Sequence, residues 1–266
     1  LLSKHPQREF NIMIRWFITL VSTFLLSACF IEQQTPPGDT SLDVQNIDGN
    51  HSQLRFNGRW EKGSIAKVSW GGSTLQMNFK GSDVAVDIEN LSQVDQWRAI
   101  VDGQIGERFS VRLGKHRYPI AHGLAADKTH QLVLMKETSD GQSFIHQLHI
   151  TGEIAPAPVA PQKLILFFGD SNMNGYSLYS EKDRGDGGSY FAYPAMSARM
   201  LNARFSKQSY GSATLTENEG NNVIDFLYSQ KRSQPSPHYR DRQKPDVIVI
   251  NAGANDISRI SKQNQR

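Results

Sequence analysis

Apolar and polar residues alternate in two different ways along the chain. Between about residues 53 and 154 apolar and polar residues alternate in short stretches, as at Leu75, Met77 and Phe79, and this period of two predicts strands with one buried face. Further strands are expected at 84–88, 97–101, 108–113, 131–136 and 144–150. Short strands without helical segments between them predict a β-sandwich of about 100 residues.

The pattern changes after the segment "APAPVAP" at 155–161, which predicts a stiff, extended linker. Residues 164–168 and 247–250 are continuous apolar runs, typical of strands that are covered on both faces. Helical patterns at 193–203 and 221–230 and a strand pattern at 205–210 lie between these runs. Alternating strands and helices predict an α/β domain with a parallel sheet at 162–266, after a sandwich domain at 53–154.

The N-terminal residues 1–29 have the features of a bacterial lipoprotein signal peptide. Arg15 precedes an apolar run at 16–26 that is too short to cross a membrane. The sequence Leu-Ser-Ala-Cys that follows resembles a lipobox, whose cysteine is lipidated and becomes the first mature residue. We therefore expect Cys29 to carry a lipid that anchors the protein to a membrane.

The residues around this signal peptide indicate where the protein starts and which membrane holds the lipid. Met13 is a better start than Leu1, and residues 30–52 are polar enough to predict a tether between the lipid and the folded part. The residue after the cysteine is Phe30, whereas an Asp at this position would resemble a signal for retention in the inner membrane. We therefore expect the protein in the outer membrane, where it faces either the periplasm or the cell surface.

Charge and cysteine content narrow the class of protein. The formal net charge is only +3, and no basic stripe is interleaved with aromatic residues, so no nucleic-acid partner is expected. Cys29 is the only cysteine, which excludes an internal disulfide.

Polar residues follow both apolar runs of the α/β region. Gly169-Asp170-Ser171 comes after the first run, and Gly253-Ala254-Asn255-Asp256 comes after the second. The carboxyl ends of parallel strands open onto one crevice, so these segments are expected to lie close together. A serine that attacks an acyl carbon needs donors for the developing oxyanion, and a backbone N–H and the Asn255 amide could supply them. Alone, Ser171 would equally well cap a helix, but its pairing with Asn255 favours catalysis.

The segments at 169–171 and 251–256 resemble the first and third sequence blocks of the SGNH (GDSL-like) esterases. The resemblance implies that Ser171 is the nucleophile and donates its N–H to the oxyanion, and that Asn255 is the side-chain donor. It also implies that Gly211, in "SYGSATL", supplies the remaining N–H, although this block departs from the Ser-Gly-x-Gly of relatives. The motif is not the GxSxG elbow, because Met173 stands in place of the second glycine.

The order and spacing of "NGRWEKG", "VDGQ", "GDSNMNGYS" and "VIVINAGANDIS" resemble carbohydrate esterase family 2 over about residues 57–258. The resemblance implies a jelly-roll-like β-sandwich followed by a partial α/β/α SGNH-hydrolase domain. It further implies removal of acetyl groups from O-acetylated polysaccharides such as xylan or glucomannan, through an acyl-enzyme and with no metal or cofactor.

The general base that this mechanism requires is missing from the sequence. SGNH relatives carry a histidine in a DxxH block well after GxND, whereas no histidine follows His238 and the sequence ends at Arg266. The one DxxH, at 127–130, lies in the predicted sandwich, and we interpret His130 as a strand-edge residue. His238 is expected at the opposite end of the sheet from Ser171. We therefore expect either a truncated copy of a longer esterase, with an apolar sheet edge left exposed, or an inactive product.

Two other functions fit the sequence. The first is an inactive surface lipoprotein whose sandwich binds carbohydrate, for which Trp60, Trp70 and Trp97 are candidates for an exposed aromatic strip, although each is equally suited to a core. The second is an SGNH esterase of other acyl groups, which would need a long apolar groove that the polar segment at 172–192 does not predict.

Overall fold

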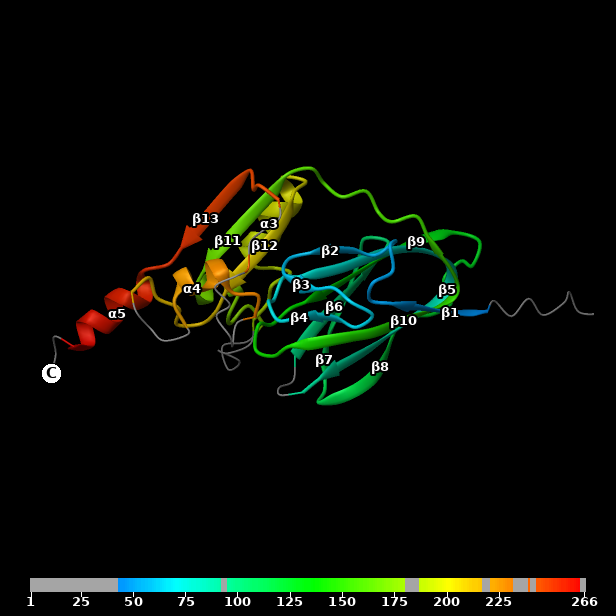
Figure 1. The fold of residues 1–266 in the computed structure, drawn as a ribbon, viewed down its shortest axis with the longest axis horizontal. Coiled ribbons are helices and arrows are strands. Elements are labelled where there is room, and N and C mark those ends of the chain that lie inside the picture. The colour runs from blue at the N-terminus through cyan, green and yellow to red at the C-terminus, as the bar shows by residue number, and fades with distance from the viewer. Residues whose placement is uncertain are drawn as a thin grey trace, which may run out of the picture. The chain divides into compact units, whose positions relative to one another are not determined.

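The computed structural model describes residues 43–91, 95–179, 187–216, 221–231, 239 and 243–263 (Figure 1). The predicted signal peptide with Cys29, the first part of the predicted tether and His238 lie outside these residues. Within the described part, no helix has the length and apolarity needed to cross a membrane.

The first part of the fold is built from antiparallel strands. The strands are β1 (Val44–Asp48), β2 (Arg55–Asn57), β3 (Trp60–Glu61), β4 (Ala66–Val68), β5 (Thr74–Asn90), β6 (Asp95–Val101), β7 (Gln104–Val111), β8 (Gly114–Ala121), β9 (Thr129–Lys136) and β10 (Ser143–Ala155). Their hydrogen-bonded order is β3-β4-β10-β5-β9-β6-β7, with β1 paired to β10 and both β2 and β8 paired to β5.

Two long strands, β5 and β10, pass from one layer of the sandwich to the other. The first half of β5 pairs with β9, and its second half pairs with β8. Where the partner changes, Gly81 of β5 lies opposite Gly152 of β10. A Cβ atom on Gly81 would lie 2.2 Å from the Thr151 carbonyl oxygen, and one on Gly152 would lie 2.1 Å from that of Lys80. Only glycine permits this close crossing, so the pair allows the sheet to fold over itself.

The core lies between the two layers, as the period of two predicts. The inward side chains of β5 are buried in both halves of the strand, at Leu75, Met77, Phe79, Val84, Val86 and Ile88. Trp97 of β6 is fully buried in the same cluster.

Five strands were not predicted: the short strands β2, β3 and β4, and the edge strands β1 and β8. The second half of the segment 30–52 is not a tether, because β1 pairs antiparallel with β10 and places Ile47 in the core at 1% exposure. Strand β8 pairs with β5, yet most of its side chains are exposed or only partly buried. An edge strand needs few inward apolar residues, so its sequence pattern is weak.

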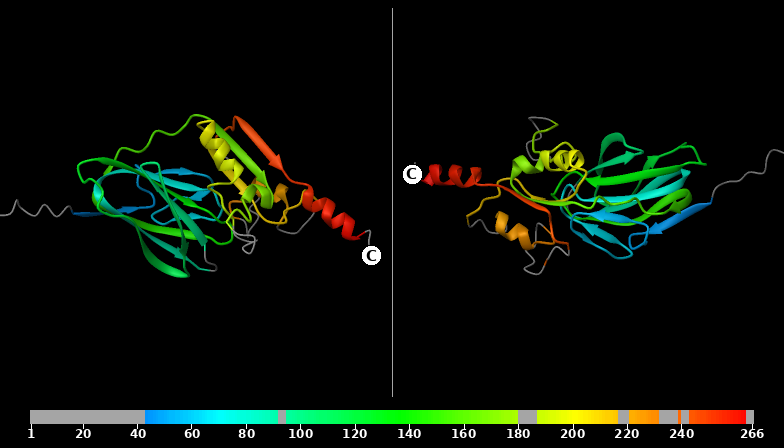
Figure 2. Two further views of the ribbon diagram at one scale, coloured as in Figure 1. Left: turned by 180° about the vertical axis from the view of Figure 1, so that it is seen from behind. Right: turned by 90° about the horizontal axis from the view of Figure 1, so that it is seen from above.

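The second part is α/β, as predicted. Its elements are β11 (Leu164–Gly169), α2 (Ser171–Asn174), α3 (Tyr193–Met200), β12 (Arg204–Ser209), α4 (Val223–Tyr228), β13 (Val247–Asn251) and α5 (Ala254–Gln263). The three strands are parallel, in the order β12-β11-β13. Helices α3 (yellow) and α4 (orange) lie on opposite faces of this sheet in the right-hand view of Figure 2, and all six residues of β11 between them are buried.

Strand β13 differs from the prediction of a strand covered on both faces. Val247, Ile248 and Ile250 are 49%, 55% and 58% exposed. Among the described residues β13 pairs only with β11, so its other edge and much of its surface face solvent. An apolar run in the sequence shows that a segment is hydrophobic, but it does not show whether other elements cover both of its faces.

A buried arginine of the sandwich holds the end of helix α4. Arg59 is fully buried, and its Nη1 atom donates hydrogen bonds to the carbonyl oxygens of Phe226 at 2.5 Å and Ser229 at 2.7 Å, while Nη2 donates to that of Leu227 at 3.0 Å. The last carbonyls of a helix lack intrahelical partners and carry partial negative charge, so a cation stabilises them. The indole N–H of Trp70 donates to the same Ser229 carbonyl, at 3.2 Å.

We expect Arg59→Met to destabilise the protein by about 3 kcal/mol, because it leaves buried carbonyl groups without donors. The measurement is the free energy of unfolding in urea. Arg55→Met is the matched control, since Arg55 is exposed and donates one long hydrogen bond, to the Pro158 carbonyl at 3.4 Å. Equal losses in the two variants would contradict the capping role.

His130 is a structural residue of the sandwich, in agreement with the interpretation of the DxxH motif. Its Nδ1 atom lies 2.6 Å from Asp102 Oδ2, and its Nε2 atom lies 3.0 Å from the Ala125 carbonyl oxygen. Because both ring nitrogens face acceptors, the imidazolium form fits this site. The hydrogen bond to Asp102 is the largest cause that raises the pKa of His130 above its ordinary value, against the opposing effect of burial.

This raised pKa predicts a pH-dependent contribution to stability. A group with a raised folded-state pKa stabilises the fold fully below its unfolded pKa, about 6.5 for histidine, and this contribution is lost as the pH rises through the folded value. The difference in melting temperature between wild type and His130→Gln should therefore be largest near pH 5 and shrink toward pH 9. The exposed His122 provides the control, because His122→Gln should show no such trend.

Candidate active site

The three predicted site residues follow the ends of three neighbouring strands. The last residue of β11 lies in register with the last residues of β12 and β13. Ser171, Gly211 and Asn255 come shortly after these ends, so the structure brings them to the same carboxyl edge of the sheet. Ligands bind at this edge in open parallel sheets.

Ser171 begins helix α2 and is held in a tight turn. The Asp170 carboxylate is 1% exposed and accepts a hydrogen bond from the Asn172 N–H at 3.0 Å, so it caps the helix. Gly169 has no room for a side chain, since a Cβ atom would lie 2.5 Å from the Asn251 carbonyl oxygen. Ser171 itself is half-buried, and its hydroxyl has no hydrogen-bond partner among the described residues.

Gly211 is packed against a tyrosine of the serine loop. Its N–H faces the Tyr176 hydroxyl at 3.4 Å, and a Cβ atom would lie 2.3 Å from the Tyr176 ring. The Tyr176 ring makes an edge contact with the ring of Tyr210, whose hydroxyl donates to Asp140 of the sandwich at 3.2 Å. Burial raises the pKa of Tyr176, so the hydroxyl stays protonated. Contacts of Tyr176 and Tyr210 therefore connect the sandwich with the loop after β12.

Helix α5 holds the same loop from the other side. The Asn255 side chain donates to the Ala213 carbonyl oxygen at 2.8 Å. The Asp256 carboxylate accepts hydrogen bonds from the Leu215 N–H and from the N–H and hydroxyl of Thr216 at 2.6–3.1 Å. These bonds, with that of the Thr216 hydroxyl the largest, lower the pKa of Asp256 to about 2. The sequence predicts no role for Asp256, because it does not predict helix α5, in whose first turn Asp256 lies.

This arrangement has the parts of an acyl-transfer site. A serine hydroxyl at the start of a helix lies at the same edge as a backbone N–H and an amide side chain. In this structure the Gly211 N–H and the Asn255 amide are engaged with Tyr176 and Ala213, and hydrogen bonds at catalytic sites often rearrange when substrate binds. Their role as oxyanion donors remains a prediction.

The sequence does not predict the buried polar contact between Asn174 and Lys207 next to the serine turn. Asn174, at the end of α2, is 1% exposed and accepts a hydrogen bond from the ammonium group of Lys207 in β12 at 2.8 Å. Burial lowers the pKa of Lys207 to about 7. A single lysine within a predicted strand carries no visible signal of such a contact.

The three tryptophans proposed for a carbohydrate-binding strip do not form one. Trp70 and Trp97 are 0% exposed and Trp60 is 9% exposed. This expectation for the non-catalytic alternative is wrong, because the side chains fill cores instead of forming a flat surface.

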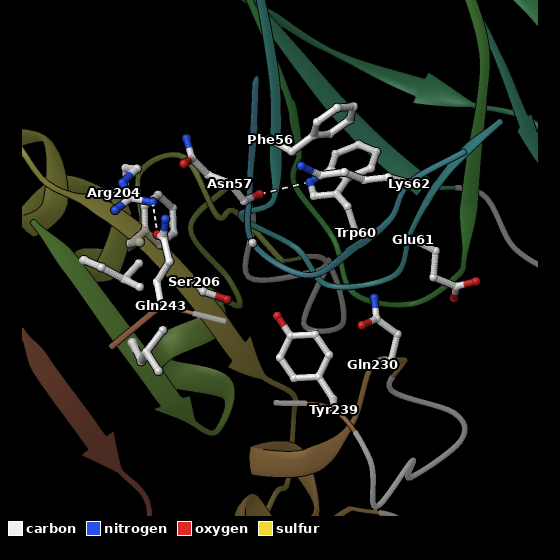
Figure 3. Close-up of a pocket in the computed structure, with 14 residues that line it drawn as sticks. Phe56, Asn57, Trp60, Glu61, Lys62, Arg204, Ser206, Gln230, Tyr239 and Gln243 are labelled. Atoms are coloured by element: carbon white, nitrogen blue, oxygen red, sulfur yellow. Dashed lines mark hydrogen bonds between the residues drawn. The ribbon is translucent and has the colours of Figure 1, made fainter. Parts of the chain in front are cut away.

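Trp60 also borders a cavity of about 790 Å³, with Phe56 and Trp60 on one side and Tyr239 on the other (Figure 3). Leu164 and Arg204, at the beginnings of β11 and β12, line it as well. The cavity therefore lies at the opposite end of the sheet from Ser171.

Comparison with known protein families identifies both parts of the chain. Residues 56–158 match the family model "Carbohydrate esterase 2 N-terminal", and residues 165–266 match "GDSL-like Lipase/Acylhydrolase". The chain belongs to carbohydrate esterase family 2. This confirms the resemblance and the combination of a β-sandwich with an SGNH-type α/β domain.

Two curated relatives support this membership of carbohydrate esterase family 2. The chain is 30% identical over 232 residues to a cellulase/esterase of Acetivibrio thermocellus, covering 81% of the chain but only 28% of that protein. It is 23% identical over 257 residues to an acetylxylan esterase / glucomannan deacetylase of Cellvibrio japonicus, covering 91% of the chain and 70% of that protein. The chain thus spans less than a third of the first of these relatives.

Solved structures of carbohydrate esterase family 2 have the same fold. A family two carbohydrate esterase from Clostridium thermocellum in complex with cellohexaose is 30% identical, with a TM-score of 0.68 over 77% of this chain and 67% of that one. A family two carbohydrate esterase from Cellvibrio japonicus is 21% identical, with a TM-score of 0.71 over 84% of this chain and 72% of that one.

The low pKa of Asp256 predicts how its loop contributes to stability. A carboxylate with a lowered folded-state pKa stabilises the fold above its unfolded pKa, about 3.9, and the contribution is lost as the pH falls toward the folded value near 2. Asp256→Asn should therefore lower the melting temperature at pH 7, and the difference from wild type should shrink below pH 4. Asp127→Asn, at an exposed position, is the control. A difference that is constant with pH would contradict the ionised carboxylate as the cause.

Proposed function

We propose that this chain is part of a serine esterase that removes acetyl groups from O-acetylated polysaccharide of the xylan or glucomannan type. The observation that carries the proposal is the register of β12, β11 and β13, which gathers Ser171, Gly211 and Asn255 at one edge of the sheet. The substrate class is supported by a relative that is named an acetylxylan esterase / glucomannan deacetylase.

In the proposed mechanism the Ser171 hydroxyl oxygen attacks the carbonyl carbon of the acetyl group. The tetrahedral intermediate carries a negative oxygen, which accepts hydrogen bonds from the N–H groups of Ser171 and Gly211 and from the Asn255 amide. Collapse of the intermediate releases the sugar hydroxyl, which takes up a proton, and leaves an acetyl group on Ser171. Attack by water then releases acetate and restores the serine. No metal takes part in these steps.

A base must take the Ser171 proton during the attack, and histidine is the usual base. The proposal places this histidine beyond residue 266, as the family resemblance implies. His130 does not fit the role, because both of its ring nitrogens are engaged in the sandwich, with Asp102 and the Ala125 carbonyl.

The proposal also includes a lipid on Cys29 and a position in the cell envelope at the outer membrane. It is supported by the apolar run at 16–26 and by the Leu-Ser-Ala-Cys sequence after it. A lipid at this position would keep the esterase near polysaccharide outside the cytoplasm.

The test is the hydrolysis of acetylated xylan and glucomannan by the full-length gene product and its Ser171→Ala variant. We expect the variant to lose about 10³-fold or more in kcat, because the covalent route is removed. Ser197→Ala, on helix α3, is the control and should keep the wild-type rate. Undiminished hydrolysis by Ser171→Ala would refute the mechanism. Faster hydrolysis of long-chain acyl esters than of acetyl esters would refute the substrate class.

A further inference from the structure

A buried lysine lies directly behind the turn that carries Ser171. Lys207, in the middle of β12, is 2% exposed, and its Nζ atom donates hydrogen bonds of 2.8 Å to the Asn174 Oδ1 and Ser189 Oγ atoms. No carboxylate lies within ion-pair distance of this ammonium group among the described residues. Its partners are therefore neutral oxygen atoms, one on helix α2 and one on the loop before α3.

Such a lysine is costly for the fold. Moving an ammonium group out of water carries a penalty of several kcal/mol, which neutral partners offset only in part. An apolar side chain at this inward position would avoid the penalty. The lysine is therefore better explained by what its hydrogen bonds hold in place than by a gain in stability.

The group that Lys207 holds most directly belongs to the serine turn. Asn174 is the last residue of α2 and Ser171 is the first, so the two are one helical turn apart. The Asn174 Oδ1 atom is also within 3.4 Å of the hydroxyl oxygens of Ser139 and Ser209, and its backbone carbonyl accepts the Gly188 N–H at 3.2 Å. Fixing Asn174 fixes the short helix, and with it the direction of the Ser171 side chain.

We propose that Lys207 is a positioning residue for Ser171 and that it acts through Asn174. This inference rests on the proposed function, because positioning matters only if Ser171 reacts. A misplacement of about 1 Å of a reacting group can cost about 10²-fold in rate. Lys207 thus contributes to the reaction without touching the substrate.

The charges that face Lys207 come from the sandwich. Glu137 favours the ammonium form and Lys136 opposes it, while burial is the largest effect and lowers the pKa to about 7. Glu137 is itself paired with Arg98 at 2.6 Å. The end of β9 therefore sets the electrostatic environment of the lysine that supports the serine turn.

A general effect on stability is the competing explanation, and Lys136 provides the matched control. Lys136 is also fully buried, but its Nζ atom pairs with Asp95 at 2.6 Å and donates to the Thr138 carbonyl, and both of these groups belong to the sandwich. Lys136→Met and Lys207→Met both remove a buried ammonium group, but Lys207→Met also removes the hydrogen bond to Asn174 of α2.

The experiment compares amide hydrogen exchange of residues 170–176 in wild type, Lys207→Met, Asn174→Ala and Lys136→Met, using the full-length protein. We expect about tenfold faster exchange of this segment in the first two variants, relative to the rest of the chain, and no relative change in Lys136→Met. With an acetyl ester, Lys207→Met should lose about 10²-fold in kcat while KM changes less than about threefold.

Two results would overturn the inference: unchanged exchange of 170–176 in a folded Lys207→Met, or an equal increase in Lys136→Met. If Lys207→Met does not fold, Asn174→Ala decides by the same criterion. An inactive wild type would refute the proposed function, whereas the exchange data would still decide whether Lys207 holds the turn.

Discussion

The structure depends on charged side chains that are buried between the sandwich and the α/β part and that find partners across this junction. The Arg59 side chain extends from the sandwich and donates hydrogen bonds to three carbonyl groups at the end of α4. Glu137, paired with Arg98, accepts a hydrogen bond from the Tyr190 N–H at 2.8 Å. Apolar contacts tolerate small shifts, but a buried charge without its partner costs several kcal/mol. The buried charged contacts therefore favour one arrangement of the two parts.

This junction fixes the loops at the candidate active site. The loop after β12 is held by Asn255 and Asp256 of α5 on one side. On the other side Gly211 faces the Tyr176 hydroxyl, and the neighbouring Tyr210 donates a hydrogen bond to Asp140 of the sandwich. The Gly211 N–H and the Asn255 amide are engaged with Tyr176 and Ala213, so these contacts order the loop itself. The sandwich thus supports this loop through Asp140.

The parts of the fold that could be predicted are those whose signal is local in sequence. The alternation in β5 and the apolar run of β11 report strands directly, and the rule that parallel strands end at one edge brought Ser171 and Asn255 together. The edge strands β1 and β8 were not predicted, because few of their side chains point inward. The buried contact of Lys207 was not predicted for another reason. Its partner Asn174 is 33 residues away in sequence, and a lysine in a strand usually faces water.

The environment of one buried tryptophan shows why the two parts cannot be treated as independent modules. Trp70 belongs to the sandwich segment of the chain, yet it packs with Phe168 of β11 and Phe226 of α4, and its indole N–H donates to Ser229 after that helix. Without the sandwich, this face of the parallel sheet would lose part of its core, the cap of α4 and the groups around Lys207. In this chain the small sheet therefore needs the sandwich to complete its packing.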